Sequence, residues 1–132
     1  MKVYPLRLRP GQDLKHEIMH FVNENGIQAG FVITCVGSLR KAALRLVGQR
    51  ETRTFNRKFE IVSLTGTVEP GGAHLHIALA DSTGAVIGGH LQGGSTIYTT
   101  AEIILGDALG YSFVREYDAE TGHLELRIVE SG

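Results

Sequence analysis

A segment in the middle of the chain contains three histidines at spacings that suit metal chemistry. In a β-strand, residues i and i+2 point to the same face, so His74 and His76 would be neighbours about 6–7 Å apart. The sequence Asp-Ser-Thr-Gly-Ala at 81–85 is typical of a three-residue hairpin loop, a type I turn followed by a left-handed glycine. Such a loop pairs its first residue with its last and places His76 directly opposite His90, with Cβ atoms about 4.5–5.5 Å apart. We therefore expect the three imidazoles to converge on one face.

The apolar residues of the same segment support this register. A two-residue turn would shift the pairing by one position and turn His90 into the core, where an unpaired polar ring is costly. In the three-residue register, five aliphatic side chains share the opposite, core face: Leu75, Ile77, Leu79, Ile87 and Leu91. The other positions on the histidine face are small and leave space for a ligand, a water or another subunit: Ala78, Ala80 and Gly88.

Three neutral imidazoles on rigid strands can hold Zn²⁺ or a related divalent ion at about 2.0–2.1 Å and leave one coordination position open. We predict a divalent metal ion, with zinc as the expected ion, on His74, His76 and His90. The alternative is three polar residues on a solvated or inter-subunit face. An open position would also allow an enzyme that uses the ion as a Lewis acid. For that reading Glu102 is the candidate acid/base, against the simpler view that it is an exposed carboxylate.

A second histidine motif competes with the triad. The sequence His16-Glu17-Ile18-Met19-His20 matches the H-E-x-x-H pattern of zinc proteases. At 100° per residue, both histidines point away from the apolar stripe of the predicted helix, whereas a protease helix turns them into a cleft. We therefore interpret this match as a coincidence.

The elements that carry these residues indicate one helix and many strands. Leu14, Ile18, Phe21 and Val22 form a helical stripe, and Asn25-Gly26 is a natural stop, so the helix is predicted over Gln12–Asn25. The expected strands are Val3–Leu8, Ala29–Cys35, Lys41–Gly48, Thr52–Lys58, Glu60–Val68, His74–Ala80, Ala85–Leu91, Thr96–Leu105, Tyr111–Tyr117 and His123–Val129. Ala101–Leu109 could instead be helical. This order predicts an α+β fold with a mainly antiparallel sheet.

The 132 residues fit a single domain over 1–132, with 42% hydrophobic and 20% charged residues. The lone Cys35 lies in an apolar run and is expected to be a buried, inert thiol. No signal peptide or long apolar stretch is evident, so we expect a cytoplasmic protein that does not use a membrane.

Positive charge is concentrated in the first part of the chain. Residues 1–58 hold 11 of the 13 Lys and Arg. Phosphate contacts need such a cluster, although they give non-specific affinity. The candidate DNA contacts are Arg40, Lys41, Arg45, Arg50, Arg53, Arg57 and Lys58, and a solvated charged surface is the alternative.

Several linked motifs carry a family resemblance. The segments are Phe59–Gly66, Pro70-Gly-Gly, His74–Asp81 and Gly84–Leu91, flanked by Gly26–Gly30 and Thr100–Ile104. Together they closely resemble the core of the PPC (plants-and-prokaryotes conserved) domain. The resemblance implies an α+β fold and a homotrimer. Prokaryotic members of the family often stand alone and are named as proposed DNA-binding proteins. Plant members carry AT-hooks and act in the nucleus on AT-rich DNA.

This chain departs from the plant pattern. It lacks the Arg-Gly-Arg-Pro hook that enters the minor groove of AT-rich DNA. Its three histidines look like a prokaryotic feature. The first hypothesis is therefore a trimeric, DNA-associated or regulatory protein that carries a metal and binds nucleic acid weakly. The alternative is a metal-dependent enzyme that acts on a small molecule, and a purely structural trimerisation module is a third possibility.

Overall fold

The structure is a computed structural model that describes residues 1–131. It contains one helix and nine strands among these residues, which confirms the predicted α+β class. The elements are β1 (Lys2–Leu8), α1 (Leu14–Glu24), β2 (Gly30–Arg45), β3 (Thr52–Phe55), β4 (Phe59–Glu69), β5 (Gly72–Ala80), β6 (Val86–Leu91), β7 (Thr96–Asp107), β8 (Tyr111–Asp118) and β9 (His123–Glu130).

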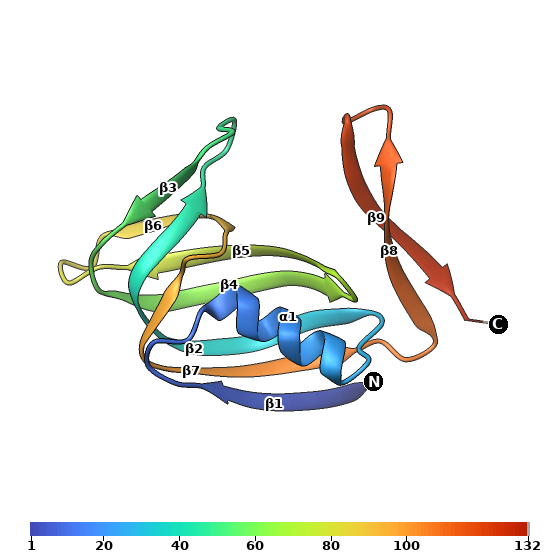
Figure 1. The fold of residues 1–132 in the computed structure, drawn as a ribbon, viewed down its shortest axis with the longest axis horizontal. Helices are drawn as coiled ribbons and strands as arrows, with labels where there is room; N and C mark the ends of the chain where they lie inside the picture. The colour runs from blue at the N-terminus through green and yellow to red at the C-terminus, as the bar shows by residue number, and fades with distance from the viewer. Residues whose placement is uncertain (132) are drawn as a thin grey trace.

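Seven strands form the main sheet, in the order β1-β7-β2-β4-β5-β6, with β3 paired to β2 (Figure 1). All of the pairings are antiparallel. The far end of β2 also pairs with β6, so β2, β4, β5 and β6 form a closed ring of neighbours. This closure covers the edge of β6 at His90 and Leu91 and brings the end of β2 beside the predicted histidine strand.

Helix α1 covers one face of the sheet (Figure 1). Asp13 is its N-cap and accepts a hydrogen bond from the backbone N–H of His16 at 3.0 Å, so the helix begins two residues later than predicted. Gly26 has φ +62 and ends the helix in the left-handed conformation, as the sequence indicates. The buried side chains are Leu14, Ile18 and Val22, which confirms the predicted stripe. No helix among residues 1–131 is long and apolar enough to cross a membrane.

The two strands expected over 29–35 and 41–48 are one continuous strand, β2. The predicted break between them, over residues 36–40, is wrong. A Cβ on Gly37 would lie 2.2 Å from the carbonyl oxygen of Thr100, so this glycine allows β7 to approach closely. Register shifts at Gly37/Leu39 and Leu39/Lys41 let the strand bend without ending.

The segment that could have been helical, 101–109, is mostly strand β7. Ala101, Ile103 and Leu105 are fully buried and alternate with more exposed residues, which is the period of a strand. Because β7 lies between β1 and β2, it gains ladder hydrogen bonds on both sides. Long-range strand pairing therefore determines that this segment is a strand and not a helix.

Strands β8 and β9 form a separate hairpin that projects from the body (Figure 1). The backbone N–H of Phe113 donates to the carbonyl of Gln28 at 2.9 Å and anchors the root of the hairpin. Farther along β8, Arg115 Nε donates to Glu69 Oε1 at 2.7 Å, and the carboxylate of Glu69 is almost completely buried. The hairpin is thus tied to the last residue of β4, where β4 pairs with the start of β5.

Candidate metal centre

The hairpin of β5 and β6 has the register that the sequence predicts. The N–H of Asp81 donates to the carbonyl of Ala85 at 2.9 Å, and the N–H of Gly84 donates back to Asp81 at 3.0 Å. Gly84 has φ +84, the left-handed conformation that the turn requires. His76 and His90 are directly opposite one another, as predicted.

The three imidazoles converge on one face of this hairpin. Ring centroids are 5.0 Å apart for His74 and His76, 5.3 Å for His74 and His90, and 5.8 Å for His76 and His90. One nitrogen of each ring lies within 4.8 Å of the others. On the opposite face, Leu75, Ile77, Leu79 and Leu91 are buried and Ile87 packs against the core, as predicted.

The local environment favours neutral imidazoles. Partial burial, and after it the nearby Arg45 guanidinium, lowers the pKa of His90 to about 4. The pKa of His74 is lowered first by partial burial, then by His76 and Arg115, while the carboxylate of Glu125 opposes the shift. A neutral imidazole keeps a lone pair for a metal ion, so both effects suit a ligand.

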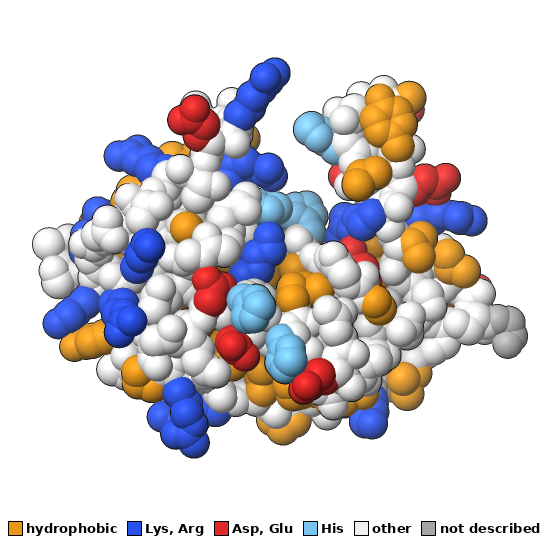
Figure 2. All heavy atoms as spheres, viewed as in Figure 1, with side chains coloured by type: hydrophobic (Ala, Val, Ile, Leu, Met, Phe, Trp, Pro, Cys, Tyr) orange, Lys and Arg blue, Asp and Glu red, His pale blue; other side chains and the backbone are white. Residues whose placement is uncertain are grey.

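Three strands outside the hairpin supply groups around the triad. Arg45, at the end of β2, is directly opposite His90, and Thr67 of β4 is directly opposite His74. Arg115 of β8 donates through Nη2 to Thr67 Oγ1 at 3.1 Å. Figure 2 shows histidines at the base of the notch between the body and the β8–β9 hairpin, with Lys and Arg side chains on both sides.

The sequence alone does not predict that groups on β4 and β8 lie beside the triad. Glu69 and Arg115 are 46 positions apart, and no local pattern links them. The sequence does set Arg115 apart in one respect, since Arg115 and Arg127 are the only Lys or Arg residues after residue 58.

A sequence profile of the Plants and Prokaryotes Conserved (PCC) domain matches residues 1–109. This chain belongs to that family, which is the PPC family that its motifs resemble. It is 52% identical over 128 residues to the bifunctional protein GlmU of Synechococcus sp. (strain JA-3-3Ab). The match covers 97% of this chain and 21% of the relative, so the chain spans about a fifth of the curated protein's length.

Two solved structures extend the comparison. A protein of Salmonella enterica is 40% identical, with a TM-score of 0.96, and the match covers 98% of this PCC chain and 94% of that chain. The metal-containing protein of Archaeoglobus fulgidus is 28% identical, with a TM-score of 0.77, over 96% and 94% of the two chains.

The H-E-x-x-H match lies away from the triad of this PCC domain. His16 and His20 are exposed on α1, and His20 Nε2 lies 3.1 Å from Glu24 Oε1 within the same helix. Among the described residues, His74, His76 and His90 are the group whose ligand atoms come together. The structure therefore supports the interpretation of the motif as a coincidence.

Glu102 is not placed next to the triad. It lies on β7 opposite Arg7 of β1 and Val36 of β2, whereas Arg45, nine residues farther along β2, is opposite His90. The candidate role of Glu102 as the acid/base of the triad is therefore wrong, because it lies too far along the strands from the three rings. Glu125 is the carboxylate whose charge acts on His74.

The seven basic candidates for DNA contact are all exposed, and Lys and Arg side chains gather at the end of the molecule formed by β3 and β6 (Figure 2). They do not form one uniform set. Arg57 lies 3.7 Å from Asp81 and stacks on Phe59, while Lys58 stacks on Tyr98. Arg45 lies beside His90.

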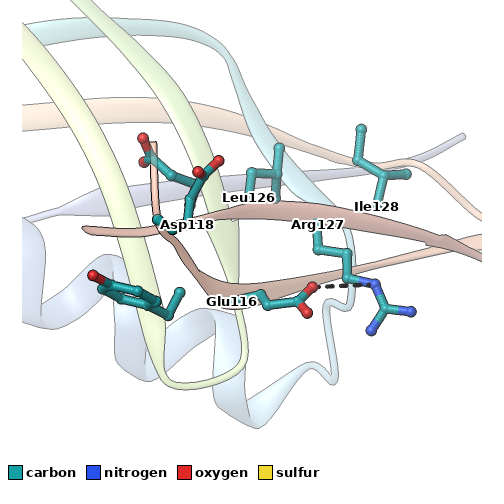
Figure 3. Close-up of a pocket in the computed structure, with 8 residues that line it drawn as sticks. Glu116, Asp118, Leu126, Arg127 and Ile128 are labelled. Carbon is teal, nitrogen blue, oxygen red and sulfur yellow. Dashed lines mark ion pairs between the residues drawn. The ribbon is translucent and has the colours of Figure 1, made fainter. Parts of the chain in front are cut away.

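The β8–β9 hairpin of this PCC chain carries a shallow hollow that contains no residue of the triad (Figure 3). Arg127 and Glu116 form an ion pair across it, with Nε and Oε2 3.4 Å apart. Leu126 and Ile128 project together to one side of β9 (Figure 3). An ion pair in so open a place contributes little, and the hollow supplies no convergent set of polar groups.

Proposed function

We propose that this PCC-domain chain holds a divalent metal ion on His74, His76 and His90, and that the ion presents an open coordination position. The observation that carries the proposal is the approach of one nitrogen from each ring to within 4.8 Å of the others. In a tetrahedral zinc site with bonds of about 2.0–2.1 Å, ligand atoms are about 3.3 Å apart. His74 and His76 are exposed, so small rotations of their side chains would bring the nitrogens to that spacing.

The donor set also suits the proposal. Three imidazoles are a known ligand set for catalytic zinc, and zinc is the expected ion. The protein of Archaeoglobus fulgidus that shares the fold is described as metal-containing, which supports the same property here. The bound ion would supply Lewis acidity at its open position, and Arg45 and Arg115 would form the walls beside it.

Metal analysis of single variants tests the proposal. We expect the protein, expressed without an affinity tag, to contain about one divalent ion per chain by elemental analysis. His76→Ala should remove the ion while the circular dichroism spectrum stays unchanged, because the core face of the hairpin is untouched. The matched control is His16→Ala/His20→Ala, which should retain the ion. Metal retained in the triple variant of His74, His76 and His90 would contradict the proposal.

We also propose that the chain forms a homotrimer. The β8–β9 hairpin exposes six large apolar side chains: Tyr111, Val114, Tyr117, Leu124, Leu126 and Ile128. An isolated two-stranded hairpin is marginally stable in water, so a partner that covers these side chains would stabilise it. A second copy of the chain is the expected partner, and rotation by one third of a turn would close a ring.

Weak DNA binding is the second candidate function. The exposed basic side chains at the β3–β6 end favour it, and a protein of Ralstonia eutropha with the same fold and 25% identity is named as a proposed DNA-binding protein. These side chains supply phosphate contacts and no recognised base-reading element. We place both functions in a reducing cytoplasm, where a single half-buried thiol such as Cys35 would stay reduced.

A further inference from the structure

We propose that Arg45 completes the histidine centre as an anion site, and that the ligand of the open metal position is a small molecule bearing a carboxylate. The inference rests on the proposed metal function and names the ligand class of that site. It concerns the side of the centre next to His90.

Arg45 supplies the positive charge of this site. It ends strand β2 directly opposite His90, so its side chain shares the face on which the three rings converge. It is exposed, and its guanidinium forms no hydrogen bond or ion pair with another side chain within residues 1–131. A guanidinium held beside three ligand rings without an acidic partner is available to a ligand.

The opposite side of the centre is electrically different. There the guanidinium of Arg115 is engaged by the buried carboxylate of Glu69, and Glu125 adds a second negative charge near His74. Excess positive charge therefore remains on the His90 side. The next residues on the same face of β5 and β6, Ala78 and Gly88, have little or no side chain, which leaves room for a ligand beside His76 and His90.

The chemistry of these groups selects the ligand. Three neutral imidazoles leave the full double charge on the metal ion, so an anionic fourth ligand is favoured. A carboxylate can place one oxygen on the ion and the other on a guanidinium, whose planar donors match it. A neutral ligand would gain only the metal bond.

Cobalt-loaded protein offers a test, because tetrahedral Co²⁺ has visible absorption bands that change when its fourth ligand changes. The metal-free protein would be loaded with Co²⁺ and titrated with acetate at constant ionic strength, and separately with imidazole as a neutral ligand. We expect Arg45→Gln to weaken acetate binding by about tenfold or more and to change imidazole binding by less than about twofold. Arg127→Gln is the matched control and should change neither, because that side chain is exposed and paired with Glu116.

The outcomes separate the two proposals. If Co²⁺ does not bind, the metal function itself is overturned, and the anion site with it. If Co²⁺ binds and is stripped by His76→Ala, but acetate does not perturb the spectrum or binds equally well to Arg45→Gln, the metal function stands and the carboxylate site is overturned. Equal losses of acetate and imidazole in Arg45→Gln would also overturn it, because they would indicate a damaged metal site.

Discussion

His90 combines the properties that a ligand position needs. The loop at 81–85 fixes it opposite His76, and partial burial together with Arg45 favours its neutral form. The same surroundings make protonation of this residue unfavourable in the folded protein. A site that holds neutral imidazoles close together therefore lowers the free energy of unfolding at acidic pH.

The unfavourable protonation of His90 predicts that the stability of the metal-free protein depends on pH. The pKa of His90 is about 4 in the folded protein, against about 6.5 in an unfolded chain. Between these values the unfolded chain binds more protons, so the free energy of unfolding falls as the pH drops from about 6.5 to about 4 and this contribution then levels off. His90→Gln should lose less stability over the same range in urea unfolding at pH 7.0 and pH 4.5, with a chelator present. Arg45→Gln should give an intermediate result, and equal losses in wild type and His90→Gln would contradict the prediction.

The triad could be predicted from sequence because its geometry is local. All three histidines lie in one hairpin, and strand periodicity, turn chemistry and the apolar face agree on its register. The groups around the triad could not be predicted in this way. Arg45 reaches His90 only because β2 bends far enough to pair with β6, and Arg115 reaches Thr67 only because a separate hairpin folds back on β4.

At the scale of elements, the close packing of β4 against β5 holds two of the three rings in place. Thr65 is opposite His76 and Thr67 is opposite His74, with Gly66 between them. A Cβ on Gly66 would lie 1.9 Å from the carbonyl oxygen of His74, and Gly66 has φ +144. The backbone at this point therefore accepts glycine alone without a shift of β5.

Gly66→Ala should consequently damage both fold and site. We expect the free energy of unfolding to fall by about 2–4 kcal/mol in urea denaturation, from backbone strain and steric overlap together. The metal content should also fall, because His74 and His76 move with β5. Gly93→Ala is the matched control: a Cβ there meets no atom within 4 Å, so stability and metal content should stay near the wild-type values. Full stability of Gly66→Ala would show that the two strands are less tightly coupled.

Strand β2 shows where prediction of strand boundaries from local sequence fails. Gly37 and Ser38 resemble a break, yet β2 continues through them because β4 and β7 supply hydrogen bonds on both sides. The hairpin strands β5, β6, β8 and β9, whose partners are close in sequence, are predicted within a few residues. The long strand β2 depends on partners in β4 that are 20–38 positions away and partners in β7 that are 55–77 positions away, and no local window of sequence contains them.

For the whole molecule, the basic end formed around β3 and β6 predicts weak binding of DNA. Each phosphate contact releases counterions, so the logarithm of affinity should fall with the logarithm of salt concentration with a slope of about −0.9 per contact. Arg53→Gln/Lys58→Gln should make that slope shallower by about 1–2 units, whereas Arg127→Gln should leave it unchanged. Fluorescence anisotropy with two unrelated duplexes between about 50 and 200 mM salt measures both effects, at protein concentrations that span the usual dissociation constants of non-specific binding, about 10⁻⁴–10⁻⁶ M. Nanomolar affinity for one duplex at physiological salt would contradict this view.

The β8–β9 hairpin would carry the interface of the proposed trimer. Tyr117 and Leu124 are directly opposite one another and are 66% and 62% exposed, so the pair forms an apolar surface that a neighbouring subunit would cover. Tyr117→Ser/Leu124→Ser should therefore shift the protein from trimer towards monomer in sedimentation equilibrium at micromolar concentration. Val47→Ser removes a side chain that is 99% exposed outside the hairpin and should leave the trimer intact. A wild-type protein that sediments with the mass of one chain would rule out the trimer, and an intact trimer in the double variant would place the interface away from the hairpin.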